Sequence, residues 1–197
     1  MRQLIFGVIL MMMALPAIAS SSIEAMIKDT ADKVLEEMRT NAELYKKDPQ
    51  KIYELVDTLV LPHFDFASMT DLALGRYSEQ VSPEQRPEIV HEFRLLLVRT
   101  YSSALLEYTD QKVVFLPMEG SEADGEVTVR AEIQQAGGFP IPIDYLLHNG
   151  EDGWKVVDVS VDDVSLVTNY RSSFARAIKK DGVDGLIQTL RARNESQ

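Results

Sequence analysis

The spacing of the apolar residues changes twice along this chain, and this constrains the fold more than any other feature. Apolar residues recur every three or four positions over residues 21–110, every second position over residues 112–161, and again at helical spacing over residues 164–193. Helical spacing predicts amphipathic helices, and alternation predicts strands with one buried face. Helices, then strands, then a helix are typical of the α+β class, with helices packed on one face of a sheet.

The middle segment predicts four strands joined by short connections. Turn-forming Gly and Asp residues lie within Glu119–Asp124, Ala136–Gly138 and Gly150–Gly153. Connections this short join antiparallel neighbours. We therefore expect a curved four-stranded antiparallel sheet, with strands at residues 112–118, 125–135, 139–149 and 153–161.

Capping residues mark the ends of the helices. Ser82 and Gln85 form a capping-box pattern before a long helix, and Gly75 suits the end of the helix that precedes it. Asp181-Gly182 breaks the last helical segment in two. The helices before the sheet are expected within residues 21–48, 48–62, 63–75 and 82–110.

The first residues have the layout of a secretory signal peptide. Arg2 supplies a basic start, residues 4–15 an apolar run, and Ala17-Ile18-Ala19 a small-residue cleavage signal. We expect residues 1–19 to be removed after Ala19, leaving residues 20–197 as a single exported, soluble domain. No later stretch approaches the roughly 20 apolar residues that a spanning helix needs.

Composition excludes several kinds of chemistry and partner. The chain contains no Cys, which rules out thiol catalysis, disulfides and cysteine metal ligands. Its 31 acidic and 20 basic residues give a net charge of −11, and loss of Arg2 with the leader makes it −12. Such a surface repels phosphate groups, so we expect no nucleic acid partner and only brief, partner-mediated membrane contact.

No arrangement of residues predicts catalysis, a cofactor or a metal. The three histidines, His63, His91 and His148, are too far apart in sequence to suggest a metal site or a triad. Asp144 and Asp162-Asp163 could supply a general base if buried, but their positions favour a solvent-facing strand residue and helix-capping acids. There is no nucleophile elbow and no phosphate-binding loop. We expect no enzyme.

One apolar row raises the question of what it covers. Phe139, Ile141, Ile143, Tyr145 and Leu147 alternate along the third predicted strand and should face one side of the sheet. That side could be ordinary core or the wall of a cavity, and periodicity does not distinguish the two.

Basic residues gather late in this acidic chain, and two of them have two interpretations. Arg171 and Arg176 suit a solvated helix face, or a contact with an anionic head group or an acidic partner.

Several segments resemble the MlaC family, also called the toluene-tolerance auxiliary family. The resemblance spans most of the chain after the leader, in the family's order. Its motifs are a Leu-Pro segment (residues 59–66), a Gly and an aromatic (Gly75, Tyr77), a capping segment (Ser82–Arg86), a helical stripe (Phe93, Leu97, Tyr101, Leu105), a Trp strand (Trp154–Val159), Val164-Ser165-Leu166, Tyr170–Phe174 and Gly182–Leu186.

This resemblance implies an NTF2-like architecture enclosing an apolar pocket, and a periplasmic phospholipid carrier that maintains outer-membrane lipid asymmetry. The partners it implies are a phospholipid, an outer-membrane lipoprotein complex and an inner-membrane ABC transporter with its substrate-binding ring. A shuttle of this kind need only be a monomer.

The predicted pocket must shield two acyl chains from water. At about 0.8 kcal/mol per methylene, roughly 30 methylenes cost up to about 24 kcal/mol when exposed. We therefore expect a pocket of about 1,000 Å³ or more. The residues predicted to bind lipid are Phe93, Leu97, Tyr101, Leu105, Phe139, Ile141, Ile143, Tyr145, Val164 and Phe174; those predicted to contact a head group or partner are Arg171 and Arg176.

Two alternative functions remain open at this point. An NTF2-like enzyme would use the same pocket, with an Asp or Tyr abstracting a proton. A ligand-free periplasmic adaptor would have a fully packed core.

Overall fold

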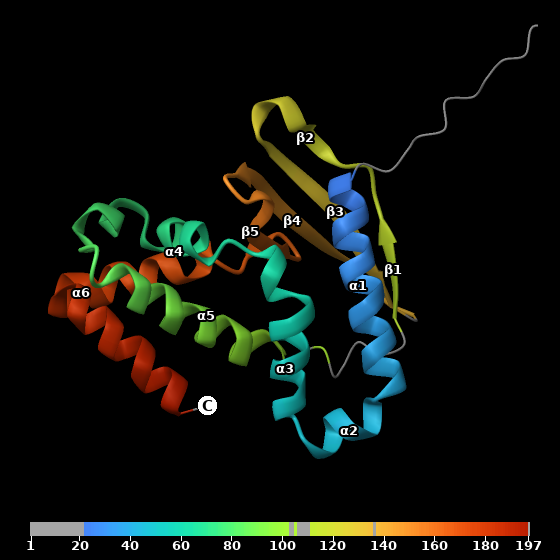
Figure 1. Ribbon diagram of the computed structural model, residues 1–197, viewed down its shortest axis with the longest axis horizontal. Helices are drawn as coiled ribbons and strands as arrows, with labels where there is room; N and C mark the ends of the chain where they lie inside the picture. Colours follow the sequence, from blue (N-terminus) through green and yellow to red (C-terminus); the bar gives the residue numbers. More distant parts are fainter. Residues whose placement is uncertain (1–21, 103–104, 106–110, 136, 197) are drawn as a thin grey trace, which may run out of the picture.

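The computed structural model describes residues 22–102, 105, 111–135 and 137–196. The predicted leader and its cleavage site lie outside the described residues. In Figure 1 the helix α1 lies against the sheet, while α4, α5 and α6 lie together beside it. Among the described helices, none is long and apolar enough to cross a membrane.

The helices before the sheet follow the sequence predictions, with one break added. The first predicted helix is two helices, because Asn41 leaves helical geometry between them. Gly75 ends α4 at φ 53°, a backbone conformation that favours glycine. The bounds are α1 Ser22–Thr40, α2 Ala42–Lys47, α3 Gln50–Leu59, η1 Leu61–His63, α4 Phe66–Leu74, η2 Gly75–Gln80 and α5 Arg86–Ser102.

The predicted capping box precedes α5. The N–H of Gln85 donates to the Ser82 hydroxyl over 3.2 Å, and the N–H of Ser82 donates to the Gln85 side chain over 3.1 Å. These bonds satisfy donors that would otherwise be unpaired at the start of the helix.

The sheet has six antiparallel strands, in the order β1-β3-β4-β5-β6, with β2 also paired to β3. The four predicted strands are confirmed as β1, β3, β4 and β5. Two short strands add to them, and η4 Glu122–Asp124 follows the first. The bounds are β1 Lys112–Phe115, β2 Glu119–Ser121, β3 Glu126–Gln134, β4 Ile141–Gly150, β5 Gly153–Val161 and β6 Val164–Ser165.

Asp162 and Asp163 form a hairpin turn and do not cap a helix. Both have positive φ, 51° and 61°, and they join β5 directly to β6. Two consecutive left-handed residues suit a two-residue hairpin, and Asp tolerates this conformation better than most residues. The capping interpretation of these two acids is therefore wrong.

A register shift changes which residues of β5 face the interior. Leu147 of β4 pairs with Val156, but Tyr145 pairs with Val159, so β5 carries one extra residue between them. Trp154 and Val156 face inward before the shift and Val159 after it, where all three pack with the same apolar cluster.

The C-terminal segment forms η5 Thr168–Tyr170 and α6 Arg171–Glu195. Gly182 interrupts α6 with non-helical angles, φ 73° and ψ −173°, so the predicted break is confirmed. In Figure 1 both parts of α6 lie beside α5.

The described apolar residues form three separate clusters. The sheet cluster joins α1 to the sheet through Ile23, Ile27, Val127, Val129, Leu147 and Val156. The N-terminal cluster joins α1, α2 and α3 through Val34, Met38, Tyr45, Ile52, Leu55 and Val56. The helical cluster joins α4, α5 and α6, chiefly through Met69, Ala73, Leu74, Ile89, Phe93, Leu96, Leu97, Phe174, Ile178, Leu186 and Leu190.

Polar contacts fasten the start of α4 to the sheet. Asp65 caps α4 by accepting from the N–H and hydroxyl of Ser68, and its other neighbour is His148 of β4, 3.1 Å away. Burial opposes ionisation of Asp65, but these hydrogen bonds outweigh it and hold the pKa of Asp65 below its ordinary value. Lys155 of β5 donates to the carbonyl of Pro62 over 2.7 Å.

Replacing Asp158 by Ala should destabilise the connection after β5. The residue is 8% exposed, and its carboxylate accepts from the N–H groups of Val159 and Val167 and from the hydroxyl of Ser165. Loss of a buried charged acceptor should lower the free energy of unfolding by about 2–3 kcal/mol in urea denaturation. The control Asp152→Ala, at an exposed turn residue, should change it by less than about 0.5 kcal/mol. Equal effects of the two substitutions would contradict this role for Asp158.

Candidate functional site: an apolar cavity

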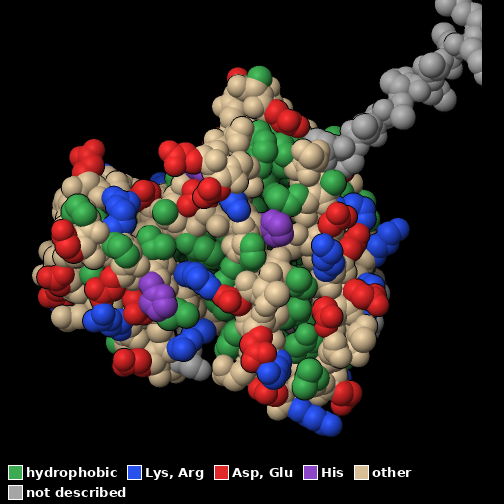
Figure 2. Space-filling model, in the orientation of Figure 1, with side chains coloured by type: hydrophobic (Ala, Val, Ile, Leu, Met, Phe, Trp, Pro, Cys, Tyr) green, Lys and Arg blue, Asp and Glu red, His purple; other side chains and the backbone are tan. Residues whose placement is uncertain are grey.

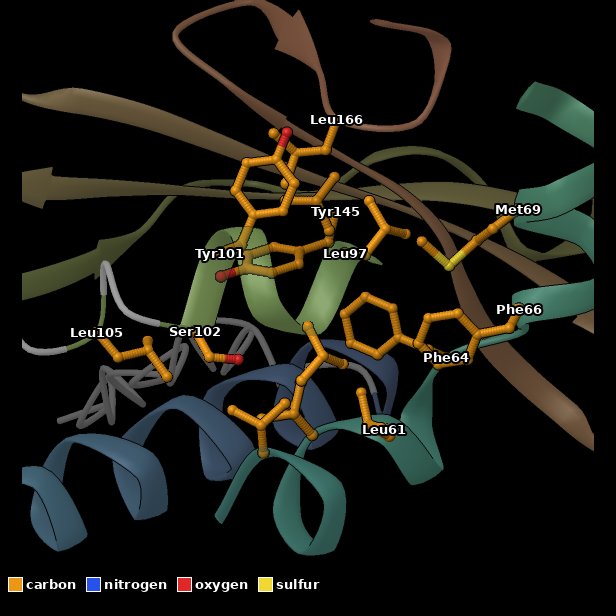
Figure 3. Close-up of a pocket in the computed structure, with 14 residues that line it drawn as sticks. Leu61, Phe64, Phe66, Met69, Leu97, Tyr101, Ser102, Leu105, Tyr145 and Leu166 are labelled. Atoms are coloured by element: carbon orange, nitrogen blue, oxygen red, sulfur yellow. The ribbon is translucent and has the colours of Figure 1, made fainter. Parts of the chain in front are cut away.

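An apolar cavity of about 240 Å³ lies between α3, η1, α4, α5 and the strands β4 and β5. Figure 3 shows its side chains converging from these elements. Apart from the hydroxyls of two Tyr and one Ser, every lining side chain is apolar. The lining residues are Val56, Val60, Leu61, Phe64, Phe66, Met69, Leu97, Val98, Tyr101, Ser102, Leu105, Tyr145, Val159 and Leu166.

The cavity lies where the three apolar clusters meet. Val56 belongs to the N-terminal cluster, Met69 and Leu97 belong to the helical cluster, and Tyr145 and Val159 pack against the sheet cluster. Each cluster is well buried internally, but none of the described elements fills the space between all three. The cavity is therefore a consequence of how the three clusters are arranged, and several elements share its wall.

Two turns of α5 contribute to the cavity, and its first turns do not. Leu97 and Tyr101, four residues apart, face the cavity from one side of the helix. Ile89 and Phe93 lie on the same stripe but are fully buried in the helical cluster. The apolar stripe of this helix thus changes partner along its length, from α6 to the cavity.

The loop after β6 supplies one further wall residue. Leu166 donates its N–H to the carbonyl of Val159 over 2.8 Å. The neighbouring N–H of Val167 donates to the Asp158 carboxylate. These bonds hold Leu166 against the cavity although it lies outside any long strand.

The polar groups of the cavity are neutral at physiological pH. Burial, the neighbouring Tyr170 and a hydrogen bond to that residue raise the pKa of Tyr101 to about 12. Burial alone raises the pKa of Tyr145 to about 12. The described residues of the lining include no carboxylate and no histidine. Neither hydroxyl is poised to act as a base near neutral pH.

Asp144, a carboxylate considered from sequence, and Asp158 of β5 both lie outside the cavity wall. Asp144 faces the guanidinium of Arg130, 3.4 Å away, and Asp158 is occupied by its three donors. Among the residues that the structure describes, no group of three His, Asp or Glu side chains could hold a metal ion.

Four of the ten residues predicted to bind lipid lie on the cavity wall. They are Leu97, Tyr101, Leu105 and Tyr145. They come from the two elements that the prediction combined, α5 with the segment just after it and the strand β4.

Phe139 does not cover the interior, so its predicted place on the apolar row is wrong. It is 92% exposed and precedes β4, which begins at Ile141. Ile141 and Ile143 do lie on the row, but they are half-buried and beyond the cavity. Val164 is 54% exposed, because the Asp162-Asp163 turn directs the chain away before Leu166 returns to the wall.

Phe93 and Phe174 are core residues and do not line the cavity. Their exposures are 0% and 1%, and their rings meet edge to face with centroids 5.0 Å apart. Tyr170 completes the contact, 5.2 Å from Phe93. These rings join α5 to α6. The prediction that Phe93 and Phe174 are buried is confirmed, but they pack against each other and not against the cavity.

The two predicted basic contact residues differ in their availability. Arg171 donates to the backbone carbonyl of Leu72, over 2.9 and 3.1 Å, and covers Gly75. Its contact ties α6 to α4 while the residue stays exposed, and its contact with a head group or partner remains a prediction. Arg176 is exposed on α6 and makes no ion pair with another described residue.

One wall of the cavity was not expected from sequence. Phe64 and Phe66 project into it from the start of α4, with stacked rings 6.0 Å apart, and Leu61 joins them from η1. The signal available in sequence was the pair of aromatic residues directly after the helix-ending Pro62, in a segment where no amphipathic stripe requires them.

The cavity is smaller than expected. A cavity of roughly 150 Å³ with apolar walls holds benzene. The volume of about 240 Å³ therefore accommodates a short length of one hydrocarbon chain and not two complete acyl chains. The expectation of about 1,000 Å³ is corrected, because Phe64, Phe66 and Leu97 occupy part of the space between helix and sheet.

The fold and this site define a helix-and-sheet protein built around an apolar cavity, in agreement with the predicted α+β, NTF2-like class. The family model of the MlaC protein matches residues 28–192. The chain belongs to the MlaC family.

Individual relatives agree with this assignment. The chain is 25% identical to toluene tolerance protein ttg2D of Pseudomonas putida, over 90% of this chain and 84% of that protein. It is 27% identical to the intermembrane phospholipid transport system binding protein MlaC of Haemophilus influenzae, over 88% and 83%. A phospholipid-binding protein from Ralstonia solanacearum, solved in complex with a phospholipid, superposes with a TM-score of 0.81 at 34% identity, covering 89% of this chain and 98% of that one.

The same Val→Phe substitution in the two strands that flank Tyr145 should show whether the cavity can accept a larger side chain. Val129 and Val159 both pair with Tyr145, but Val129 is fully buried while Val159 lines the cavity. Val129→Phe overfills a packed cluster and should lower the free energy of unfolding by about 1–3 kcal/mol. Val159→Phe should leave it nearly unchanged, because its ring enters the cavity. Urea denaturation of both variants measures this, and equal losses would contradict usable space beside Val159.

Proposed function

We propose that this chain is a periplasmic phospholipid carrier that moves lipid between an outer-membrane lipoprotein complex and an inner-membrane ABC transporter. The observation that supports this most strongly is the apolar cavity, found in a fold that superposes on a protein solved with a phospholipid. The relative from Haemophilus influenzae, a binding protein of an intermembrane phospholipid transport system, supports the transport role.

The wall of the cavity has the chemistry that such a carrier needs. Exposed acyl chains cost about 0.8 kcal/mol per methylene, so a carrier must cover most of both chains. A wall made mostly of aliphatic and aromatic side chains is suited to cover hydrocarbon. Selection of a head group requires no further site, since the cavity would recognise the acyl-chain part of the lipid.

Loading must widen the cavity, because its volume of about 240 Å³ is too small for two chains. The three clusters around it are internally packed, so they can separate as units with little loss of their own contacts. A partner that favours the widened form would promote both loading and release.

The location and partners follow from the same proposal. Residues 1–19 would direct export and be removed after Ala19, and residues 20–197 would form the lipid-binding domain. Figure 2 shows acidic and basic side chains mixed over the face that carries α3, α5 and α6, so charge is not gathered in one patch there. We propose that membrane contact runs through the lipoprotein complex and the transporter's substrate-binding ring, with Arg176 as one contact. A monomer is sufficient for this shuttle.

Lipid transfer between vesicles tests the proposal. The mature protein should speed the movement of a fluorescent phospholipid from donor to acceptor vesicles, and Val159→Phe should slow that movement severalfold by occupying the cavity. Val81→Ala, a change in the helical cluster away from the cavity wall, serves as the control for altered stability. Absence of transfer by the wild-type protein would favour the ligand-free adaptor, and release of fatty acid would favour an enzyme.

A further inference from the structure

The cavity has a polar end and an apolar end. Tyr101 and Ser102 lie at the C-terminal end of α5 and Leu105 lies just beyond it, whereas Phe66 and Met69 come from α4. In Figure 3 the ring of Tyr145 extends from β4 toward the side of Ser102 and away from Phe64 and Phe66. The hydroxyls of Ser102 and Tyr145 therefore lie on the side of the end of α5, whereas the hydroxyl of Tyr101 points toward Leu166.

The opposite end is closed by packed side chains. Met69 and Leu97 are 3% and 7% exposed and belong to the helical cluster. Phe64 and Phe66 stack beside them. A hydrocarbon chain in the cavity would meet only carbon and sulfur at this end.

Two of the hydroxyls lack a partner within the described part of the chain. Ser102 is 4% exposed, and neither it nor Tyr145 forms a hydrogen bond with another described residue. Tyr101 differs, since its hydroxyl is hydrogen-bonded to Tyr170. Covering an unpaired hydroxyl with hydrocarbon costs free energy. A ligand that fills this cavity therefore either offers a hydrogen-bond acceptor to these hydroxyls or binds with lower affinity.

We propose that Ser102 and Tyr145 donate hydrogen bonds to the ester carbonyl oxygens of a diacyl lipid, whose chains run from there toward Phe66 and Met69. This inference rests on the proposed function and adds a direction and a chemical class: fatty-acid esters bind with their carbonyls at the α5 end. Neutral hydroxyls suit this role, because a neutral hydroxyl donates to a carbonyl and an ionised one does not.

Competition between ester and ether lipids tests the inference. The mature protein is incubated with vesicles that contain equal amounts of a diester and a diether phosphatidylethanolamine with matched chains, separated from them, and extracted for mass spectrometry. The two lipids differ in their carbonyls, so the wild-type protein should retain the diester in about fivefold to hundredfold excess, the combined effect of two net hydrogen bonds. Tyr145→Phe and Ser102→Ala should each reduce that excess, and the double variant should abolish it.

Each outcome separates this inference from the proposed function. Tyr77→Phe, which removes a buried hydroxyl of the helical cluster away from the cavity, should keep the wild-type ratio. Bound lipid at a wild-type ratio of one, or a ratio unaffected by both variants, would overturn the ester contact alone. Recovery of neither lipid would instead overturn the carrier. The wild-type ratio needs no variant, so the test stands even if a substituted protein fails to fold.

Discussion

The structure depends on the burial of apolar side chains in three clusters, which lie next to one another and leave a space between them. One cluster joins α1 to the sheet, one joins α1, α2 and α3, and one joins α4, α5 and α6. Close packing within each cluster stabilises the fold, while the space between them is the cavity. The same hydrophobic effect thus accounts for the stability of the chain and for its capacity to cover hydrocarbon.

Polar contacts position the walls of this space. Asp65 joins the start of α4 to His148 of β4, and Asp158 holds the loop that carries Leu166. Arg171 fastens α6 to α4 through the carbonyl of Leu72. These side chains would look like candidates for acid–base or ligand chemistry in sequence alone, but in the structure they hold backbone segments in place.

The sequence predicted the elements well and their partners less well. Alternation predicted β3, β4 and β5. Capping and turn residues predicted the end of α4 at Gly75, the start of α5 and the break at Gly182. Alternation did not show that the row begins at Ile141 and leaves out Phe139, since the segment before a strand can have the same alternating pattern as the strand. Helical spacing showed that Phe93 and Tyr101 are on one stripe, but not that the first meets α6 and the second a cavity. Cavity volume depends on distances between elements far apart in sequence, and no local pattern contains it.

The central claim is that the space between the three clusters holds the chains of one phospholipid. Native mass spectrometry of the mature protein, taken from the periplasm of a bacterial host without detergent, tests this most directly. The account predicts a mass that exceeds the polypeptide by one phospholipid, and organic extraction should release that lipid intact. A polypeptide mass alone, from protein that is folded and has been in contact with membranes, would contradict the account.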